Sequence, residues 1–281
     1  MQLASKQLVT MHLQMSILGV FMLLTISASS MAGNLPLLTT PTLQIEKKSA
    51  SSRLSSELSI SNTLEAAQKL QILSQIIAKD YFFIAQQLRE EKANAEMEPS
   101  IRAMDRQISL IHAKNKNEAI ANLLTYLQDV AIEFKHILKQ DYTKKNGTLV
   151  LDYSETLYEG AQSIISQLTS KNKKHNGLIA QQQLILQRIS KFYIAYQAGF
   201  SDKSMTQQLQ TSVAEFEKGV NEISHRHYAN GLDNEVSKLQ KYWPIAKKFY
   251  LGMEKGDLTL IVFISTDHMN SSLNKLILSQ S

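Results

Sequence analysis

Two stretches of the chain place amide and cationic side chains beside apolar residues that recur at helical spacing. Such side chains on the flank of a packed helix can hydrogen-bond an anion, a small polar ligand or the carbonyl groups of a partner helix. We therefore predict ligand or partner contacts for the members of these two stretches that flank the apolar stripe: Gln71, Gln75, Lys79, Gln183, Gln187, Arg188 and Lys191. The alternative is that each side chain only forms part of a solvated helix face.

The residue types give little indication of catalysis. The chain contains no cysteine, which excludes disulfides, thiolate metal sites and cysteine nucleophiles. It also lacks a phosphate-binding loop, a dinucleotide fingerprint and a G-x-S-x-G motif. His225 and His227 are close in sequence, but residues two apart on a helix point to different sides, unlike the i, i+4 pair that binds zinc. We expect no enzyme, no metal site and no cofactor.

The composition favours an all-α fold. The 281 residues include only 10 glycines and 4 prolines, too few for a many-turned β fold or for glycine-rich nucleotide-binding turns. The net charge is +5, but acidic and basic residues are mixed along the chain. This mixing argues against nucleic acid as a partner.

Apolar residues at three- and four-residue spacing predict four helices between residues 70 and 168. Pro99 either opens the second of these helices or kinks it. Helix boundaries are predicted from polar and glycine-containing signals: Asn115 and Asn117, Asn146-Gly147, Gly199 with Ser201 as N-cap, Asn230-Gly231 and Gly256-Asp257. Trp243-Pro244 predicts a kink plugged by an aromatic ring, with ligand stacking as the alternative.

The same pattern occurs twice. Residue n matches residue n+112 without a gap, as in the pairs Ile77 and Ile189, Leu127 and Leu239, and Val150 and Val262. This repeat predicts two copies of one unit, at residues 63–170 and 175–281. Four amphipathic helices with short connections bury their stripes as an up-down bundle. We therefore expect two tandem four-helix up-down bundles in an elongated pair, joined by a Lys- and Asn-rich link at 171–176.

The N-terminus predicts export. Lys6 precedes a short apolar run from Met15 to Ala28, and small residues follow as far as Ala32. This is the order of a secretory signal peptide, predicted here at 1–32, with a Ser- and Pro-containing tether at 33–62. We expect a soluble periplasmic or secreted protein. The alternative is an uncleaved N-terminal helix that anchors the chain in the inner membrane.

The segment Ala67–Lys79, AQKLQILSQIIAK, resembles the opening helix of the PilJ or NarX-like N-terminal sensor domain of type IV pilus methyl-accepting chemotaxis transducers. Ala180–Lys191 is similar to the same helix, more weakly. Val213-Ala-Glu-Phe-Glu resembles the second helix of the family, and Trp243-Pro244 its third, so that the resemblance covers about residues 63–281. It implies extracytoplasmic four-helix sensor bundles that pass a ligand signal to a membrane-embedded transducer.

The chain departs from the family at one binding position. In nitrate-sensing relatives an arginine of the opening helix holds the anion at a dimer seam, and the matching residues here are Gln71 and Gln183. A neutral amide lacks the positive charge and the paired N–H donors with which a guanidinium binds a planar oxyanion. Nitrate binding is therefore not predicted. We expect no second membrane span and no cytoplasmic signalling helix after the second copy, and therefore signalling through a partner.

Two functional hypotheses follow. In the first, the protein is an exported sensor that binds a small polar ligand or docks on a membrane sensor or chemoreceptor. In the second, it is a structural helical spacer or homodimer of an envelope assembly and has no ligand pocket. Ligand-dependent thermal stabilisation separates the two, because only a binder gains stability with ligand concentration.

Overall fold

The computed structural model describes residues 42–115, 117–169, 177–226, 228, 232–252 and 259–279. Side chains are described from Glu57 onward. Several predictions lie outside these ranges: the signal peptide at 1–32, the link at 171–176, the helix-boundary signals Asn230-Gly231 and Gly256-Asp257, and His227. Residues 48–281 form one compact unit, and every side-chain contact described below lies within it.

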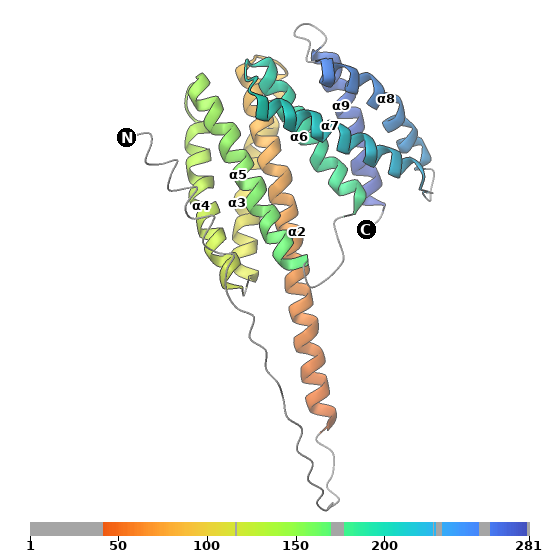
Figure 1. Ribbon diagram of the computed structural model, residues 1–281. Coiled ribbons are helices and arrows are strands. Elements are labelled where there is room, and N and C mark those ends of the chain that lie inside the picture. The colour runs from red at the N-terminus through yellow and green to blue at the C-terminus, as the bar shows by residue number, and fades with distance from the viewer. Residues whose placement is uncertain are drawn as a thin grey trace, which may run out of the picture. The chain divides into compact units, whose positions relative to one another are not determined.

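The fold is all-α, as the composition and the apolar spacing predicted. Eight helices and no strand occur in the described ranges (Figure 1). The helices are α2 (Thr42–Ala85), α3 (Glu90–Lys114), α4 (Glu118–Leu138), α5 (Lys144–Thr169), α6 (Leu178–Gln197), α7 (Lys203–Ser224), α8 (Asp233–Gly252) and α9 (Thr259–Leu278).

Helices that follow each other in the chain pack together, and α6 packs against α9 as well. In the first half, α4 packs against α3 and α5. In the second half, α6 packs against α7 and α9, and α8 packs against the same two helices. The assignment of each half to an up-down four-helix bundle, the bounds of the two copies and their elongated pairing stay predictions.

The register of the sequence repeat matches the positions of the helices. Ala85 ends α2, and its equivalent in the second copy, Gln197, ends α6. Equivalent apolar residues are buried in both halves, as in the pairs Leu127 and Leu239, and Leu157 and Met269. Equivalent apolar stripes are therefore buried in the core in both halves of the chain.

The segment predicted as a tether, 33–62, is helical from Thr42 onward. Pro41 stands directly before the first residue of α2, and neither glycine nor proline follows until Pro99. Serine disfavours a helix interior only modestly, so the serine-rich segment continues the helix. The helix therefore begins well before the end of the segment.

Two local predictions need correction, and one open alternative is decided. Asn146-Gly147 does not separate two helices, because α5 begins at Lys144 and the Thr143 hydroxyl accepts from the Asn146 amide at 3.0 Å. Asp202, and not Ser201, caps α7, since its carboxylate accepts from the Met205 amide at 2.9 Å. Pro99 lies well inside α3, which excludes the first of its two predicted roles, that of opening the helix.

The remaining boundary signals are confirmed where they are described. Asn117 caps α4 by accepting from the Ala119 amide at 3.0 Å, and Gly199 follows α6 with a φ of 91°.

Pro244 lies inside α8, which runs on through it to Gly252. The Trp243 ring is 4% exposed and packs 4.6 Å from the Phe216 ring, so Trp243 is a core residue.

Candidate functional site

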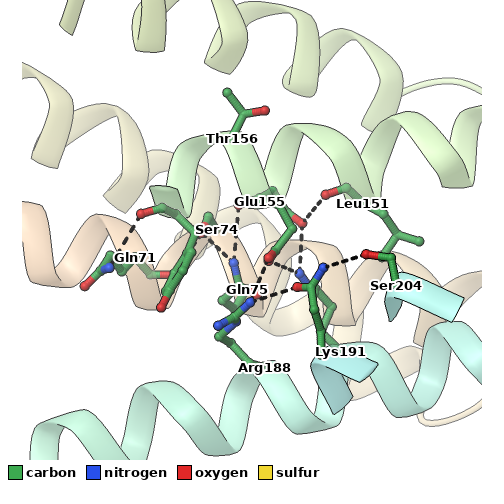
Figure 2. A network of polar contacts seen from close by, with 12 residues as sticks. Gln71, Ser74, Gln75, Leu151, Glu155, Thr156, Arg188, Lys191 and Ser204 are labelled. Atoms are coloured by element: carbon green, nitrogen blue, oxygen red, sulfur yellow. Dashed lines mark hydrogen bonds and ion pairs between the residues drawn. The ribbon is translucent and has the colours of Figure 1, made fainter. Parts of the chain in front are cut away.

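A buried ion-pair network joins α5 to α6. The ammonium of Lys191 lies 2.5 Å from Oε1 of Glu155, and the guanidinium of Arg188 lies 2.8 Å from Oε2 (Figure 2). Lys191 is 0% exposed, and its Nζ also reaches Oγ of Ser154 at 3.3 Å. Gln75 on α2 donates to the carbonyl of Ser154 at 3.3 Å. Three predicted contact residues therefore meet inside the protein.

The charges in this network stabilise one another. Burial lowers the pKa of Lys191 to about 8, although the carboxylate of Glu155 opposes the change. Burial alone would raise the pKa of Glu155, but the charges of Lys191 and Arg188 outweigh it and lower this pKa. Both partners are therefore ionised at neutral pH. Since a buried charge without a partner is strongly unfavourable, the network favours a structural role for Lys191.

Two predicted glutamines make equivalent hydrogen bonds. Gln71 donates from Nε2 to Oε1 of Gln162 at 3.0 Å, and Gln183 donates from Nε2 to Oδ1 of Asn274 at 2.5 Å. Gln71 is fully buried and Gln183 is partly exposed. Gln71 and Arg188 also line a cleft of about 370 Å³ that lies among α2, α5, α6 and α7.

A second, polar cleft is lined by residues of both α2 and α6. This polar cleft has a volume of about 430 Å³ and is lined by residues of α2, α3, α6 and α9. Three predicted residues line it, namely Lys79, Gln183 and Gln187. Lys79 donates to Oε1 of Gln187 at 3.3 Å, and Gln187 donates to Oδ1 of Asn270 at 3.3 Å. The cleft therefore presents several amides and a cation together.

Charged residues that were not predicted from the sequence also line the polar cleft. The ammonium of Lys92 lies 2.8 Å from Oδ2 of Asp267, which also pairs with Arg89. Burial alone would raise the pKa of Asp267, but hydrogen bonds from Arg89 and Lys92 lower it. Lys79 lies 3.3 Å from Oδ1 of Asp80 and 3.5 Å from Oε2 of Glu96.

The repeat register links part of this set to the network around Lys191. It pairs Asp267 with Glu155. Arg89, Lys92 and Glu96 gave no such signal, because the register pairs them with Ser201, Ser204 and Gln208.

Asp80, the neighbour of Lys79 on α2, lies in an unusual environment. It is 1% exposed, and its Oδ2 has no hydrogen-bond partner in the part of the chain that the structure describes. Burial raises its pKa to about 7, although the charge of Lys79 opposes the change. A void of about 10 Å³ adjoins Asp80, Lys79 and Lys92. Its carboxyl group is therefore placed to accept a further donor.

Metal-ligating residues do not gather among the described residues: no group of three His, Cys, Asp or Glu side chains lies close enough to hold a metal ion. The ring of His225 instead contacts the carbonyl of Asn221 through Nδ1 at 2.6 Å. Within the same ranges, no helix has both the length and the apolar character needed to cross a membrane.

Comparisons with protein-family models, with curated proteins and with solved structures find no match to this chain. The resemblance to the PilJ or NarX-like sensor domain therefore remains a hypothesis from the sequence. The function has to be argued from the site itself.

Proposed function

We propose that the protein is an exported sensor that binds a small polar ligand in the polar cleft and acts in signal transduction through a membrane receptor. The observation that carries the proposal is the meeting of Lys79, Gln183 and Gln187 in one cleft with Asn270 and Asn274. These residues come from α2, α6 and α9, which are far apart in sequence.

The size and lining of the cleft support a small ligand. Small-molecule sites commonly measure roughly 300–1,000 Å³, and the polar cleft holds about 430 Å³. Most such sites are largely apolar, whereas amides, hydroxyls and charged groups make up most of this lining. Its apolar members are Ile76, Phe83, Ala95, Pro99 and Phe263. A polar molecule can replace the water that such a surface would otherwise bind.

A thermal-shift screen tests the proposal. The probes are free amino acids, simple sugars, polyamines, nitrate and phosphate, each titrated against the wild-type protein. We expect at least one probe to raise the melting temperature in proportion to the logarithm of its concentration. Gln187→Ala should weaken this response, because it removes an amide that lines the cleft. Gln210→Ala, on the exposed face of α7, is the matched control. A flat response to every probe, or equal responses in the two variants, would contradict the proposal.

A second candidate is the structural spacer or homodimer without a ligand. The observation that favours it is the pairing of charges in the cleft, where Lys79, Arg89 and Lys92 all contact carboxylates of the same protein. The pairs of Arg89 and Lys92 with Asp267 hold the start of α3 against α9, and the pair of Lys79 with Glu96 holds α2 against α3; none of them needs a ligand. The same screen separates the two candidates, because a spacer gains no stability from any of the probes.

A further inference from the structure

We propose that the protein has a further ligand site in the cleft of about 370 Å³ among α2, α5, α6 and α7, and that this site takes a neutral amide with an apolar substituent. We call it the amphipathic cleft, because its lining combines aliphatic side chains with amides and charged groups. It shares none of the described residues that line the polar cleft.

The repeat places the two clefts at equivalent positions. The repeat register pairs three lining residues of the amphipathic cleft with three of the polar cleft: Gln71 with Gln183, Gln162 with Asn274, and Tyr158 with Asn270. In the same register Arg188 of the amphipathic cleft corresponds to Ile76 of the polar cleft. The duplicated unit therefore provides two clefts, and their different linings select different ligands.

A buried acceptor lines the amphipathic cleft without a partner. Gln71 is 0% exposed, and its Nε2 donates to Oε1 of Gln162 at 3.0 Å and to the carbonyl of Tyr158 at 3.5 Å. Since a backbone carbonyl can only accept, the bond to Tyr158 identifies the nitrogen end of the Gln71 amide. Oε1 of Gln71 has no donor among the described residues. A buried acceptor of this kind needs one.

An unpartnered donor lines the same cleft. The guanidinium of Arg188 lies 2.8 Å from Oε2 of Glu155 and 4.2 Å from the centre of the Tyr158 ring (Figure 2). Its Nε has no acceptor within the described part of the chain. Gln71 contacts the backbone of Tyr158 from α2, and Arg188 contacts the ring of the same residue from α6. The unpartnered acceptor and the unpartnered donor therefore belong to side chains on either side of one tyrosine.

The charges around the amphipathic cleft favour a neutral ligand. The described lining contains one cation, Arg188, and one acid, Glu215. Arg188 in turn shares Glu155 with Lys191, so that these four groups carry two charges of each sign. An ionic ligand would place an unbalanced charge beside a buried ion-pair network, which is unfavourable.

An amide satisfies both unpartnered groups. It donates through its nitrogen and accepts through a separate carbonyl oxygen, so that one small group can bond to Oε1 of Gln71 and to Nε of Arg188. An apolar substituent on the amide would lie against the aliphatic part of the lining, which consists of Ile165, Leu184 and Ile185. Burial of this substituent adds the hydrophobic contribution that small-molecule sites commonly use.

Matched probes titrated against the wild-type protein test the proposal. Hexanamide donates and accepts, N,N-dimethylhexanamide only accepts, and hexanoate and hexylammonium are charged. We expect hexanamide to raise the melting temperature with increasing concentration. It should bind at least about fivefold more tightly than each of the other three probes. No response to hexanamide, or equally tight binding of any other probe, would overturn the proposal.

Two variants and one contact measurement locate the site. Gln71→Met removes the acceptor from a side chain of similar length, so it should weaken hexanamide at least about fivefold. Gln183→Met, at the equivalent position in the polar cleft, is the matched control and should leave this affinity unchanged. In the wild-type protein, nuclear Overhauser effects should connect hexanamide with the methyl groups of Leu184 and Ile185. Equal affinities in the two variants, or contacts only with methyl groups elsewhere, would overturn the proposal.

The outcome is independent of the proposed function. If a polar probe stabilises the protein through Gln187 while hexanamide does not bind, the amide site is wrong and the sensor function stands. If hexanamide binds through Gln71 while no polar probe stabilises the protein, the amide site stands and the polar cleft is not a ligand site.

Discussion

Gln71 and Gln183 occupy the same position in the two copies of the repeat and donate the same kind of hydrogen bond, each from its side-chain amide to the amide oxygen of a residue 91 positions later. One acceptor is on α5 and the other on α9, so that the two halves tie equivalent helices together in the same way. The two bonds differ in burial, however, and this difference leads to the first prediction.

Gln71→Ala should lower the free energy of unfolding by about 1–3 kcal/mol, because it truncates a fully buried side chain and removes its hydrogen bond to Gln162. Gln183→Ala should cost less than about 1 kcal/mol, because water can reach the equivalent bond. Urea denaturation of both variants measures the difference. Equal losses of stability would contradict this reading of the two sites.

Lys191→Met should destabilise the protein by about 3–5 kcal/mol, because it leaves Glu155 buried beside Arg188 alone. The double variant with Glu155→Gln should recover part of that loss, since no unpaired carboxylate remains. Lys69→Met is the control, because the Lys69 and Glu65 pair is exposed and should contribute less than about 1 kcal/mol. A double variant no more stable than Lys191→Met would show that the ion pair is not the cause.

Asp80 should make stability depend on pH. Its pKa rises from 3.8 to about 7 in the folded protein, mainly through burial. Between these two values the unfolded chain has released the proton and the folded chain still holds it, so stability falls as pH rises. Above pH 7 the full cost is present, and it amounts to at most about 4 kcal/mol.

Asp80→Asn removes this dependence. Melting temperatures of the wild-type and variant proteins from pH 4 to pH 8 should therefore diverge, with the variant gaining relative stability up to about pH 7. Other groups titrate alike in both proteins and cancel in the comparison. A constant difference across this range would mean that Asp80 ionises normally.

Gly147 should tolerate no side chain. A Cβ atom at this position would lie 2.5 Å from Cζ of Phe200, whose ring packs 5.3 Å from the ring of Phe82. We expect Gly147→Ala to cost about 1–3 kcal/mol through overpacking. Phe200→Leu in the same chain should restore part of the loss. If the single variant is as stable as the wild-type protein in thermal unfolding, this packing is wrong.

The helices could be predicted from the sequence because they depend on local spacing. Buried positions such as Leu127 and Leu239 followed directly from the apolar pattern. The start of α2 could not be predicted from composition, because serine-rich sequence reads as a tether while nothing in it forbids a helix. Only Pro41 indicated where the helix begins.

The candidate site could be predicted only in part. Lys79 and Gln187 were identified because they flank an apolar stripe, and the structure brings them to 3.3 Å of each other. Asp267 and Arg89 were missed, since their pairing joins residues that are distant in sequence. Arg89 also has a φ of 53° in the short connection between α2 and α3, a conformation that spacing rules do not indicate.

The central claim is that the polar cleft binds a small polar ligand, and nuclear magnetic resonance of its side-chain amides tests it most directly. The probe is the compound that gives the largest thermal stabilisation in the screen. We predict that it shifts the amide signals of Gln183, Gln187, Asn270 and Asn274, and that the signal of exposed Gln210 stays in place. Unmoved signals in the cleft, or shifts confined to other surfaces, would contradict the claim.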